Sequence, residues 1–191
     1  MLKHFGVAFR MTIVSIVLLG LIYPLAMTAA AQAIFPRQAN GSLVTVNGKL
    51  VGSAIVGQLW TEPQYFQGRP SAAGKGYDPT STGGTNFGAT SKKLIDNTRA
   101  TIATLEKQNP DAKGAPPMDL VTTSASGIDP DISPEAAYWE APRVSKARKT
   151  SVAKIDDLIA QHVQGRTFGF LGEPHVNVLE LNLALDGLKP Q

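Results

Sequence analysis

Residues 11–35 read MTIVSIVLLGLIYPLAMTAAAQAIF, and this run contains no Asp, Glu, Lys, Arg or His. As a helix with a rise of 1.5 Å per residue it would be roughly 37 Å long, whereas the hydrocarbon core of a bilayer is about 30 Å thick. The segment therefore predicts one transmembrane helix. Pro24 removes one helical hydrogen bond, so we expect the span to bend there.

A cleaved secretory signal peptide is the competing interpretation of the same segment. Lys3 and Arg10 give a basic start, and Ala31-Gln32-Ala33 resembles a small-residue cleavage site. The uncharged run exceeds the roughly 7 to 15 apolar residues usual in a signal peptide, which favours a retained anchor. An exported protein with a cleaved leader would instead begin near Ile34.

Charge predicts the orientation of the chain in either case. Basic residues near a span stay on the cytoplasmic side, and Lys3 and Arg10 lie on its short N-terminal side. We therefore expect residues 1–10 to be cytoplasmic, residues 11–35 to span the inner membrane once, and residues 36–191 to form one extracytoplasmic, periplasmic domain. Small residues and the proline of the span are candidates for packing against other membrane helices: Gly20, Pro24, Ala26, Ala29, Ala30 and Ala33.

Composition limits what the outer domain can do. The 191 residues include no cysteine, so disulfides and thiolate metal sites are excluded. The chain has 18 Lys and Arg and 15 Asp and Glu. Because Lys3 and Arg10 precede the span, 16 basic and 15 acidic residues remain in the outer domain, which is therefore close to neutral. A nucleic-acid partner is not expected, because such domains carry a clustered excess of positive charge.

The outer domain is predicted to belong to the α+β class. Asn47-Gly48 between two β-branched runs indicates an antiparallel hairpin within residues 42–58. Residues 60–91 are rich in Gly, Pro, Ser and Thr, which predicts a long loop held by aromatic rings. A helix should begin after Thr90 or Ser91 and end at Asn109-Pro110.

Further elements are expected in the C-terminal half. Residues 118–122 should be extended, and Ser133-Pro134 should start a helix that Pro142 breaks or bends after one or two turns. Another helix should begin near Ser151, with Gly165 following its end. The alternating leucines in residues 179–185 predict a half-buried strand.

Enzymatic motifs were sought and few candidates were found. His162 and His175 lack the spacing of a zinc site, and the serines at 124 and 126 lack the spacing of a nucleophile motif. Residues 68–76 (GRPSAAGKG) resemble a phosphate loop, but the spacing is one residue too long.

Two charged groups have simple structural explanations. Asp129, Asp131 and Glu135 lack the calcium-loop spacing, so turn formation explains them better. The basic run of Arg143, Lys146, Arg148 and Lys149 predicts a solvated helix face, with an acidic partner or lipid headgroups as the alternative. We therefore predict neither catalytic residues nor a metal site.

Five blocks, in this order, resemble one family. They are YFQGRPSA (65–72), TGGTNFGATS (82–91), DLVTTSASGIDPDISPEAA (119–137), PRVSKAR (142–148) and VNVLELNLALD (176–186). Together with Tyr23-Pro24 in the apolar segment, they resemble the KdpC family, the C subunit of the Kdp potassium-transporting P-type ATPase of bacteria and archaea. The resemblance covers the whole chain.

The resemblance implies an accessory subunit without hydrolytic chemistry of its own. Its partners in the Kdp complex would be the potassium-binding KdpA, the ATP-hydrolysing KdpB and the very small KdpF, and the complex would use ATP and Mg²⁺ to take up K⁺. It also implies a catalytic chaperone role, in which KdpC raises the ATP affinity of KdpB. The chain departs from the family pattern at Ala89, Ser91, Ala125 and Glu140, the last where glutamine is common.

Residues in these blocks are the candidate partner contacts. They are Phe66, Gly68, Arg69, Pro70, Ser71, Gly83, Gly84, Asn86, Gly88, Ser124, Ser126, Gly127, Asp129 and Arg143. Two rival functions remain beside that of an accessory protein: an exported hydrolase with a cleaved leader, and a membrane-tethered solute-binding module.

Overall fold

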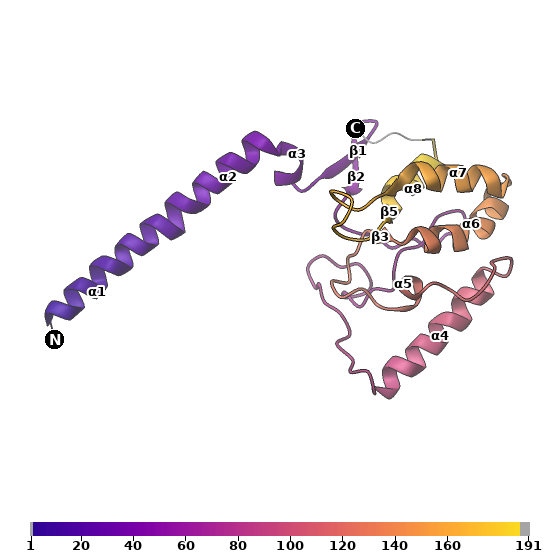
Figure 1. Cartoon of the computed structure of the whole chain (residues 1–191), viewed down its shortest axis with the longest axis horizontal. Coiled ribbons are helices and arrows are strands. Elements are labelled where there is room, and N and C mark those ends of the chain that lie inside the picture. The colour runs from indigo at the N-terminus through magenta and orange to yellow at the C-terminus, as the bar shows by residue number, and fades with distance from the viewer. Residues whose placement is uncertain (1, 188–191) are drawn as a thin grey trace. The chain divides into compact units, whose positions relative to one another are not determined.

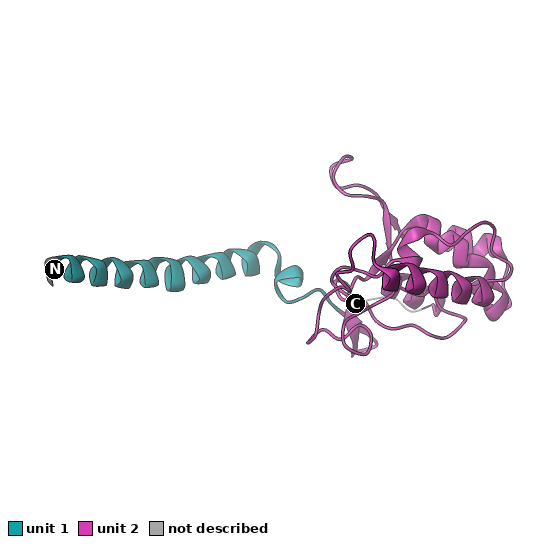
Figure 2. Ribbon diagram, turned by 90° about the horizontal axis from the view of Figure 1, so that it is seen from below, with its two compact units in different colours: residues 1–43 teal, residues 44–191 magenta. Residues whose placement is uncertain are grey.

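A computed structural model describes residues 2–187 of the chain. The chain divides into two compact units, Met1–Leu43 and Val44–Gln191, coloured separately in Figure 2. The fold is α+β, as the sequence predicts, with an apolar N-terminal helix and helices mixed with antiparallel strands in the second unit (Figure 1).

The first unit is one long helical rod. It comprises α1 (Leu2–Ser15), the π-helix η1 (Ile16–Ile22) and α2 (Tyr23–Ile34), followed by the short helix α3 (Pro36–Ala39). Residues His4–Ile34 are long and apolar enough to cross a membrane, and none of them is buried within the structure. The helix therefore begins several residues before the predicted start of the span at Met11.

The π-helix explains how the rod accommodates Pro24. The backbone N–H of Tyr23 donates to the carbonyl of Leu18, five residues earlier, instead of to the usual partner four residues earlier. This wider turn lies directly before the proline, where the ring would otherwise crowd the preceding turn. The helical segments follow one another without an interrupting loop, from η1 directly into α2, so the chain stays helical through Pro24.

The predicted hairpin is confirmed. Strands β1 (Leu43–Val46) and β2 (Lys49–Ser53) form a two-stranded sheet. Asn47 and Gly48 between them have φ of 51° and 76°, the left-handed pair that a type I′ turn requires. Val44 and Val46 point into the second unit and are buried there.

The predicted long loop is also confirmed. Within the described chain, residues 54–91 form no helix and no regular strand. Aromatic rings hold this segment: Phe66 is fully buried, and the Trp60 and Tyr65 rings lie 4.8 Å apart between centroids. Tyr65 also lies under the guanidinium of Arg148.

Helix α4 (Lys92–Gln108) follows Ser91 and ends before Asn109, as expected. Within this helix only Leu105 is buried, and Ile95 is 43 % exposed. The extended segment expected at residues 118–122 is wrong: Met118–Val121 form the short helix α5. The side chains of Leu120 and Val121 are buried. The two prolines before Met118 do not prevent this single helical turn, because they precede its first residue.

Helix α6 (Pro134–Arg148) begins as predicted, with the Ser133 hydroxyl accepting from the N–H of Ala136. The predicted break at Pro142 is wrong, because the helix continues for six more residues. Burial of Arg143, Val144 and Ser145 beyond the proline stabilises that continuation against the lost hydrogen bond.

Helix α7 (Val152–His162) is capped by Ser151, as predicted, and packs on α6. The end expected at Gly165 is wrong: the helix stops at His162 and passes directly into β4 (Val163–Gln164). The three-stranded sheet has the order β3-β5-β4, with β3 at Asp131–Ile132 and β5 at His175–Asn177, and both pairs are antiparallel.

The strand expected from Leu179 is wrong. Val178–Leu185 form helix α8, capped by the Asn177 side chain, which accepts from the N–H of Glu180. The helix lies between two apolar clusters, with Leu179 and Leu183 in the cluster of Val44 and Val46 and with Val178 and Leu181 in the main core. A helix buried on opposite faces can carry leucine at alternate positions, so the alternation did not distinguish it from a strand.

Candidate functional site

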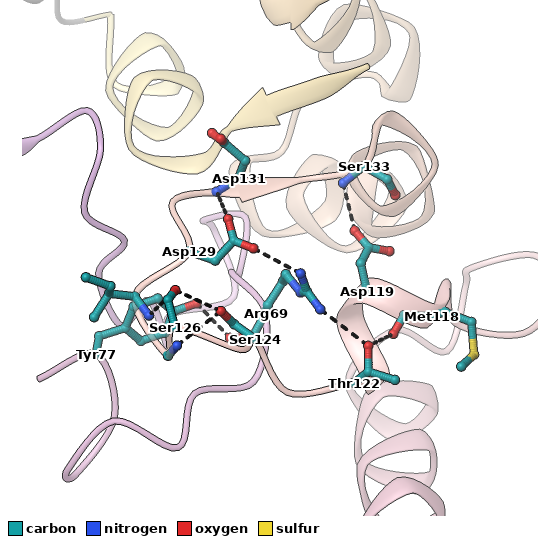
Figure 3. A network of polar contacts seen from close by, with 12 residues as sticks. Arg69, Tyr77, Met118, Asp119, Thr122, Ser124, Ser126, Asp129, Asp131 and Ser133 are labelled. Atoms are coloured by element: carbon teal, nitrogen blue, oxygen red, sulfur yellow. Dashed lines mark hydrogen bonds and ion pairs between the residues drawn. The ribbon is translucent and has the colours of Figure 1, made fainter. Parts of the chain in front are cut away.

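Three loops far apart in sequence meet in what we call the loop junction, residues 68–77, 83–84 and 124–129. Backbone bonds join them: Ser124 N–H donates to the Pro70 carbonyl at 3.0 Å, and Gly83 N–H donates to the Ser126 carbonyl at 2.8 Å. Figure 3 shows its polar network. The glycine loop and the TSASG segment, which the sequence singled out separately, thus form one structure.

Arg69 links the loop junction to the adjacent elements. Its guanidinium lies 2.9 Å from the Asp129 carboxylate and 3.5 Å from the Thr122 hydroxyl (Figure 3). Asp129 also accepts from the N–H of Asp131, at the start of β3. This half-buried pair therefore fixes the 124–129 loop against the first strand of the sheet.

The side chain of Tyr77 packs inside the loop junction. Its hydroxyl donates to the Arg69 carbonyl at 2.7 Å, and burial, with the nearby Asp129 carboxylate, raises the pKa of Tyr77 to about 12. A Cβ on Gly57 would lie 2.5 Å from the Tyr77 ring, and one on Gly68 would lie 2.2 Å from its hydroxyl. Both glycines are required by the approach of this ring.

The Ser71 hydroxyl organises the turn that resembled a phosphate loop. It accepts from the N–H groups of Ala73 and Tyr77 and donates to the Gly127 carbonyl. These donors would have to face outward to cradle an anion. Residues 68–76 are therefore a structural turn around a serine side chain.

Gly127 is a second position in the junction where only a glycine fits. Its φ is 73°, and an added Cβ would lie 2.7 Å from the Ala73 side chain and 2.8 Å from the Gly83 carbonyl. At Gly84 an added Cβ would lie 3.0 Å from the Ala125 carbonyl, whereas at Gly88 it would meet nothing within 4 Å. The loops pack backbone to backbone, which larger residues would prevent.

A buried ion pair, which we call the polar clamp, holds the 63–67 loop from inside. Glu140 is fully buried, and its carboxylate accepts from Arg143 and from the N–H of Gln67. Arg143 also donates to the carbonyls of Pro63 and Tyr65. Burial raises the pKa of Glu140, against the opposing effect of the Arg143 charge.

Asn182 on α8 completes this arrangement. Its side chain accepts from the N–H of Phe66 and donates to the Phe66 carbonyl, as a neighbouring strand would. The loop therefore has fixed backbone partners without belonging to a sheet, which satisfies its buried polar groups.

The candidate partner contacts lie at different depths. Phe66 is entirely in the core, and Arg143 and Ser124 are buried, so in this structure they support the loops from beneath. Asn86, Gly88 and Ser126 are exposed. Gly127 is buried in the loop junction. The other candidates in the junction are half-buried: Gly68, Arg69, Pro70, Ser71, Gly83, Gly84 and Asp129. The six candidates in the apolar helix are all exposed.

A cavity of about 450 Å³ lies between the loop junction and α4. Arg69 and Lys75 contribute cationic side chains, Trp60 and Tyr77 contribute rings, and Thr101 contributes a hydroxyl. Among the described residues that line it, none is acidic. The Nε1 of Trp60 and the Nε of Arg69 are buried donors without a hydrogen-bond partner in the described part of the chain.

The remaining charged candidates are dispersed. The described residues hold no group of three His, Cys, Asp or Glu side chains suited to a metal ion. The basic run does not form one solvated face: Arg143 belongs to the polar clamp, and Arg148 donates to Asp186 and to two backbone carbonyls. Lys146 pairs with Asp111 on the surface.

Sequence reasoning missed several supporting residues. Asn182 and Gly57 gave no motif, because their roles depend on contacts with other elements of the fold: Phe66 is 116 positions from Asn182, and Tyr77 is 20 positions from Gly57. Asp119, which accepts from the N–H of Ser133, is another such case. Asn177 did carry a signal, since Asn followed three residues later by Glu is a capping box.

Comparison with known proteins identifies the family. The family model described as "K+-transporting ATPase, c chain" matches residues 5–187. Relatives named potassium-transporting ATPase KdpC subunit include one from Koribacter versatilis, 49% identical over 100% of this chain and 97% of its own. Another, from Myxococcus xanthus, is 52% identical over 97% of this chain and 89% of its own. The chain therefore belongs to the KdpC family, the c chain of the K⁺-transporting ATPase.

Proposed function

We propose that this chain is a non-catalytic accessory subunit of a high-affinity, ATP-driven potassium uptake complex, needed for its assembly and stability. Its partners are the potassium-binding KdpA, the ATP-hydrolysing KdpB and the small KdpF. The observation that carries the proposal is the family match over residues 5–187, which includes both the apolar helix and the folded unit. The complex uses ATP, Mg²⁺ and K⁺, and the apolar helix anchors this chain in the cell's inner membrane.

The chaperone role is the finer part of the proposal: the chain raises the affinity of KdpB for ATP. Glu140, which stands where the family often has glutamine, is fully buried and bonded to Gln67 and Arg143. This burial argues against nucleotide contact at that position. With the folded unit outside the membrane, the effect would reach KdpB through contacts between the proteins of the complex.

The loop junction is the proposed docking surface. Its backbones are fixed by the hydrogen bonds of Ser71, Ser124 and Ser126, so the loops lose little conformational entropy when a partner binds. Ala125 and Ser126 are exposed on it. A rigid surface with small side chains permits a partner backbone to approach closely.

Substitution of Ala125 tests this surface without disturbing the fold. In Ala125→Arg, a large charged side chain projects from an exposed position, so we expect less recovered complex and lower K⁺-dependent ATPase activity. Ala160→Arg, at an exposed position on α7, is the matched control and should leave both unchanged. Gly83→Val with Gly84→Val should also lower assembly, because Gly84 touches the Ala125 backbone.

The outcomes separate docking from the chaperone role. Complex recovered in full from Ala125→Arg and from the double valine variant would show that the loop junction is not the docking surface. For the chaperone role, the KM of KdpB for ATP should rise when this chain is omitted. An unchanged KM would refute that role while leaving the assembly role intact.

A further inference from the structure

The connection between β4 and β5 carries an exposed apolar tip. Phe168, Phe170 and Leu171 are 84%, 69% and 50% exposed. Residues 167–172 include no charged side chain. Single exposed apolar residues are ordinary on a protein surface, but two phenylalanines and a leucine within four positions concentrate apolar surface on one short turn.

The tip has a defined backbone. Thr167 and Leu171 exchange two backbone hydrogen bonds, at 2.9 and 3.0 Å, which closes a tight turn. Phe168 within that turn has a φ of 54°, a left-handed conformation that is unfavourable for a bulky side chain. The turn therefore combines an unfavourable backbone conformation with exposed aromatic rings. Backbone strain of this kind is concentrated at functional sites.

One basic and one acidic side chain lie at the base of the tip. Arg166 and Glu173 form an ion pair of 2.6 Å across it, with side chains 45% and 78% exposed. A guanidinium at such a position has further N–H groups that can donate to phosphate. Apolar side chains at the end and a cation a few residues behind them suit the boundary between lipid tails and headgroups.

The connection to the apolar helix keeps the second unit close to lipid. That helix ends at Ile34 and the second unit begins at Val44. The nine residues between them, even fully extended, reach at most about 36 Å. A short tether of this kind gives the second unit a high effective concentration at the bilayer that holds the helix.

We propose that Phe168, Phe170 and Leu171 insert into the lipid–water interface of the bilayer that holds the N-terminal helix. Lipid suits this tip better than a protein partner does. A stable protein interface buries about 1,000 Å² or more with complementary shape, which a tip of three side chains does not provide by itself. Insertion into lipid requires only that the apolar side chains leave water.

The lack of cysteine permits a direct test with the full chain. Phe168→Cys, labelled with the environment-sensitive fluorophore NBD, is reconstituted into vesicles of phosphatidylethanolamine and phosphatidylglycerol. We expect blue-shifted emission, and loss of most of that emission when the acyl chains are brominated. Glu106→Cys, exposed on α4, is the matched control and should show neither change.

A second variant tests whether the neighbouring ring contributes. Phe170→Asp in the labelled chain should abolish the blue shift and the quenching, while the thermal unfolding of the second unit stays the same because Phe170 is largely exposed. The proposal is overturned if the label is unquenched in vesicles, if Phe170→Asp has no effect, or if Glu106→Cys is quenched equally. A blue shift that arises only in the assembled complex, without bromolipid quenching, would assign the tip to a protein partner.

Discussion

Gly127 shows how much of the loop junction depends on one position. In Gly127→Ala the new methyl would need a left-handed backbone and would meet the Ala73 side chain at 2.7 Å. We expect the free energy of unfolding of the second unit to fall by about 1 to 3 kcal/mol or more, the usual cost of such strain. Trp60 and Trp139, both in this unit, allow denaturant unfolding to be followed by tryptophan fluorescence.

Gly88→Ala is the matched control for that measurement. Gly88 has open space around it and needs no positive φ, so alanine should change stability by about 1 kcal/mol at most and can increase it. Equal effects at the two glycines would contradict the close packing of the three loops.

Tyr77 gives the junction a defined pH dependence. Its pKa is 10.0 in the unfolded chain and about 12 in the folded one, so the folded state retains the phenolic proton more tightly. The stabilisation is present below pH 10 and is lost as the pH rises to 12, by about 2 to 3 kcal/mol in total. Tyr77→Phe removes this dependence, so the stability difference between wild type and variant should shrink across that interval.

A difference between Tyr77→Phe and wild type that stays constant from pH 9 to pH 12 would contradict burial of this hydroxyl. Comparing two chains cancels the titration of lysines and other tyrosines, which both share. Urea unfolding at each pH, followed by tryptophan fluorescence, supplies the values.

Helix α6 carries both charged residues of the polar clamp, and loss of the cation alone should destabilise the second unit. Arg143→Met leaves the Glu140 carboxylate buried without its cation, which typically costs about 3 to 5 kcal/mol. Burial then raises the pKa of Glu140 further above 4.5, so the folded state holds the proton more tightly. The destabilisation should therefore be smallest near pH 4 and grow as the pH rises.

The double variant Glu140→Gln with Arg143→Met tests whether the unpaired carboxylate causes this loss of stability. It removes the unpaired charge, so we expect it to recover part of the loss and to show little pH dependence. If Arg143→Met were equally destabilised at pH 4 and pH 8, the ion pair would not be the source of the effect.

At the level of elements, local signals predicted the starts of helices better than their ends. Ser133 and Ser151 cap α6 and α7 as expected, because a serine side chain satisfies backbone donors a few residues away. Pro142 was misjudged because its cost is local, whereas the burial that offsets it involves α7 and the 63–67 loop. Helix α8 was misjudged because two clusters, one made by the hairpin, enclose it.

At the level of the site, the sequence predicted which segments are special but not what their residues do. The glycine loop and TSASG were singled out, and the structure joins them at Gly83 and Ser126. That Phe66 and Arg143 lie inside could not be read from the chain, since their partners are distant in sequence: Asn182 on α8 and Asn109 directly after α4. Long-range pairing of this kind leaves no spacing to recognise.

For the whole molecule, the charge distribution around the apolar segment predicts that the second unit lies outside the cell. Lys3 and Arg10 precede the uncharged run of residues 11–35, and the predicted orientation keeps them inside. In a chain without natural cysteine, Lys49→Cys on the hairpin should react with a membrane-impermeant maleimide in intact spheroplasts as fully as after lysis. His4→Cys should react only after lysis, which makes it the matched control.

The same labelled chains distinguish a retained anchor from a cleaved leader. The mass of the Lys49→Cys product should include the first 33 residues if the helix is kept, whereas cleavage after Ala33 would leave a chain that begins at Ile34. Protection of Lys49→Cys until lysis would place the folded unit in the cytoplasm. Direct contact with ATP would then become possible, and the chaperone effect would no longer need to cross the membrane.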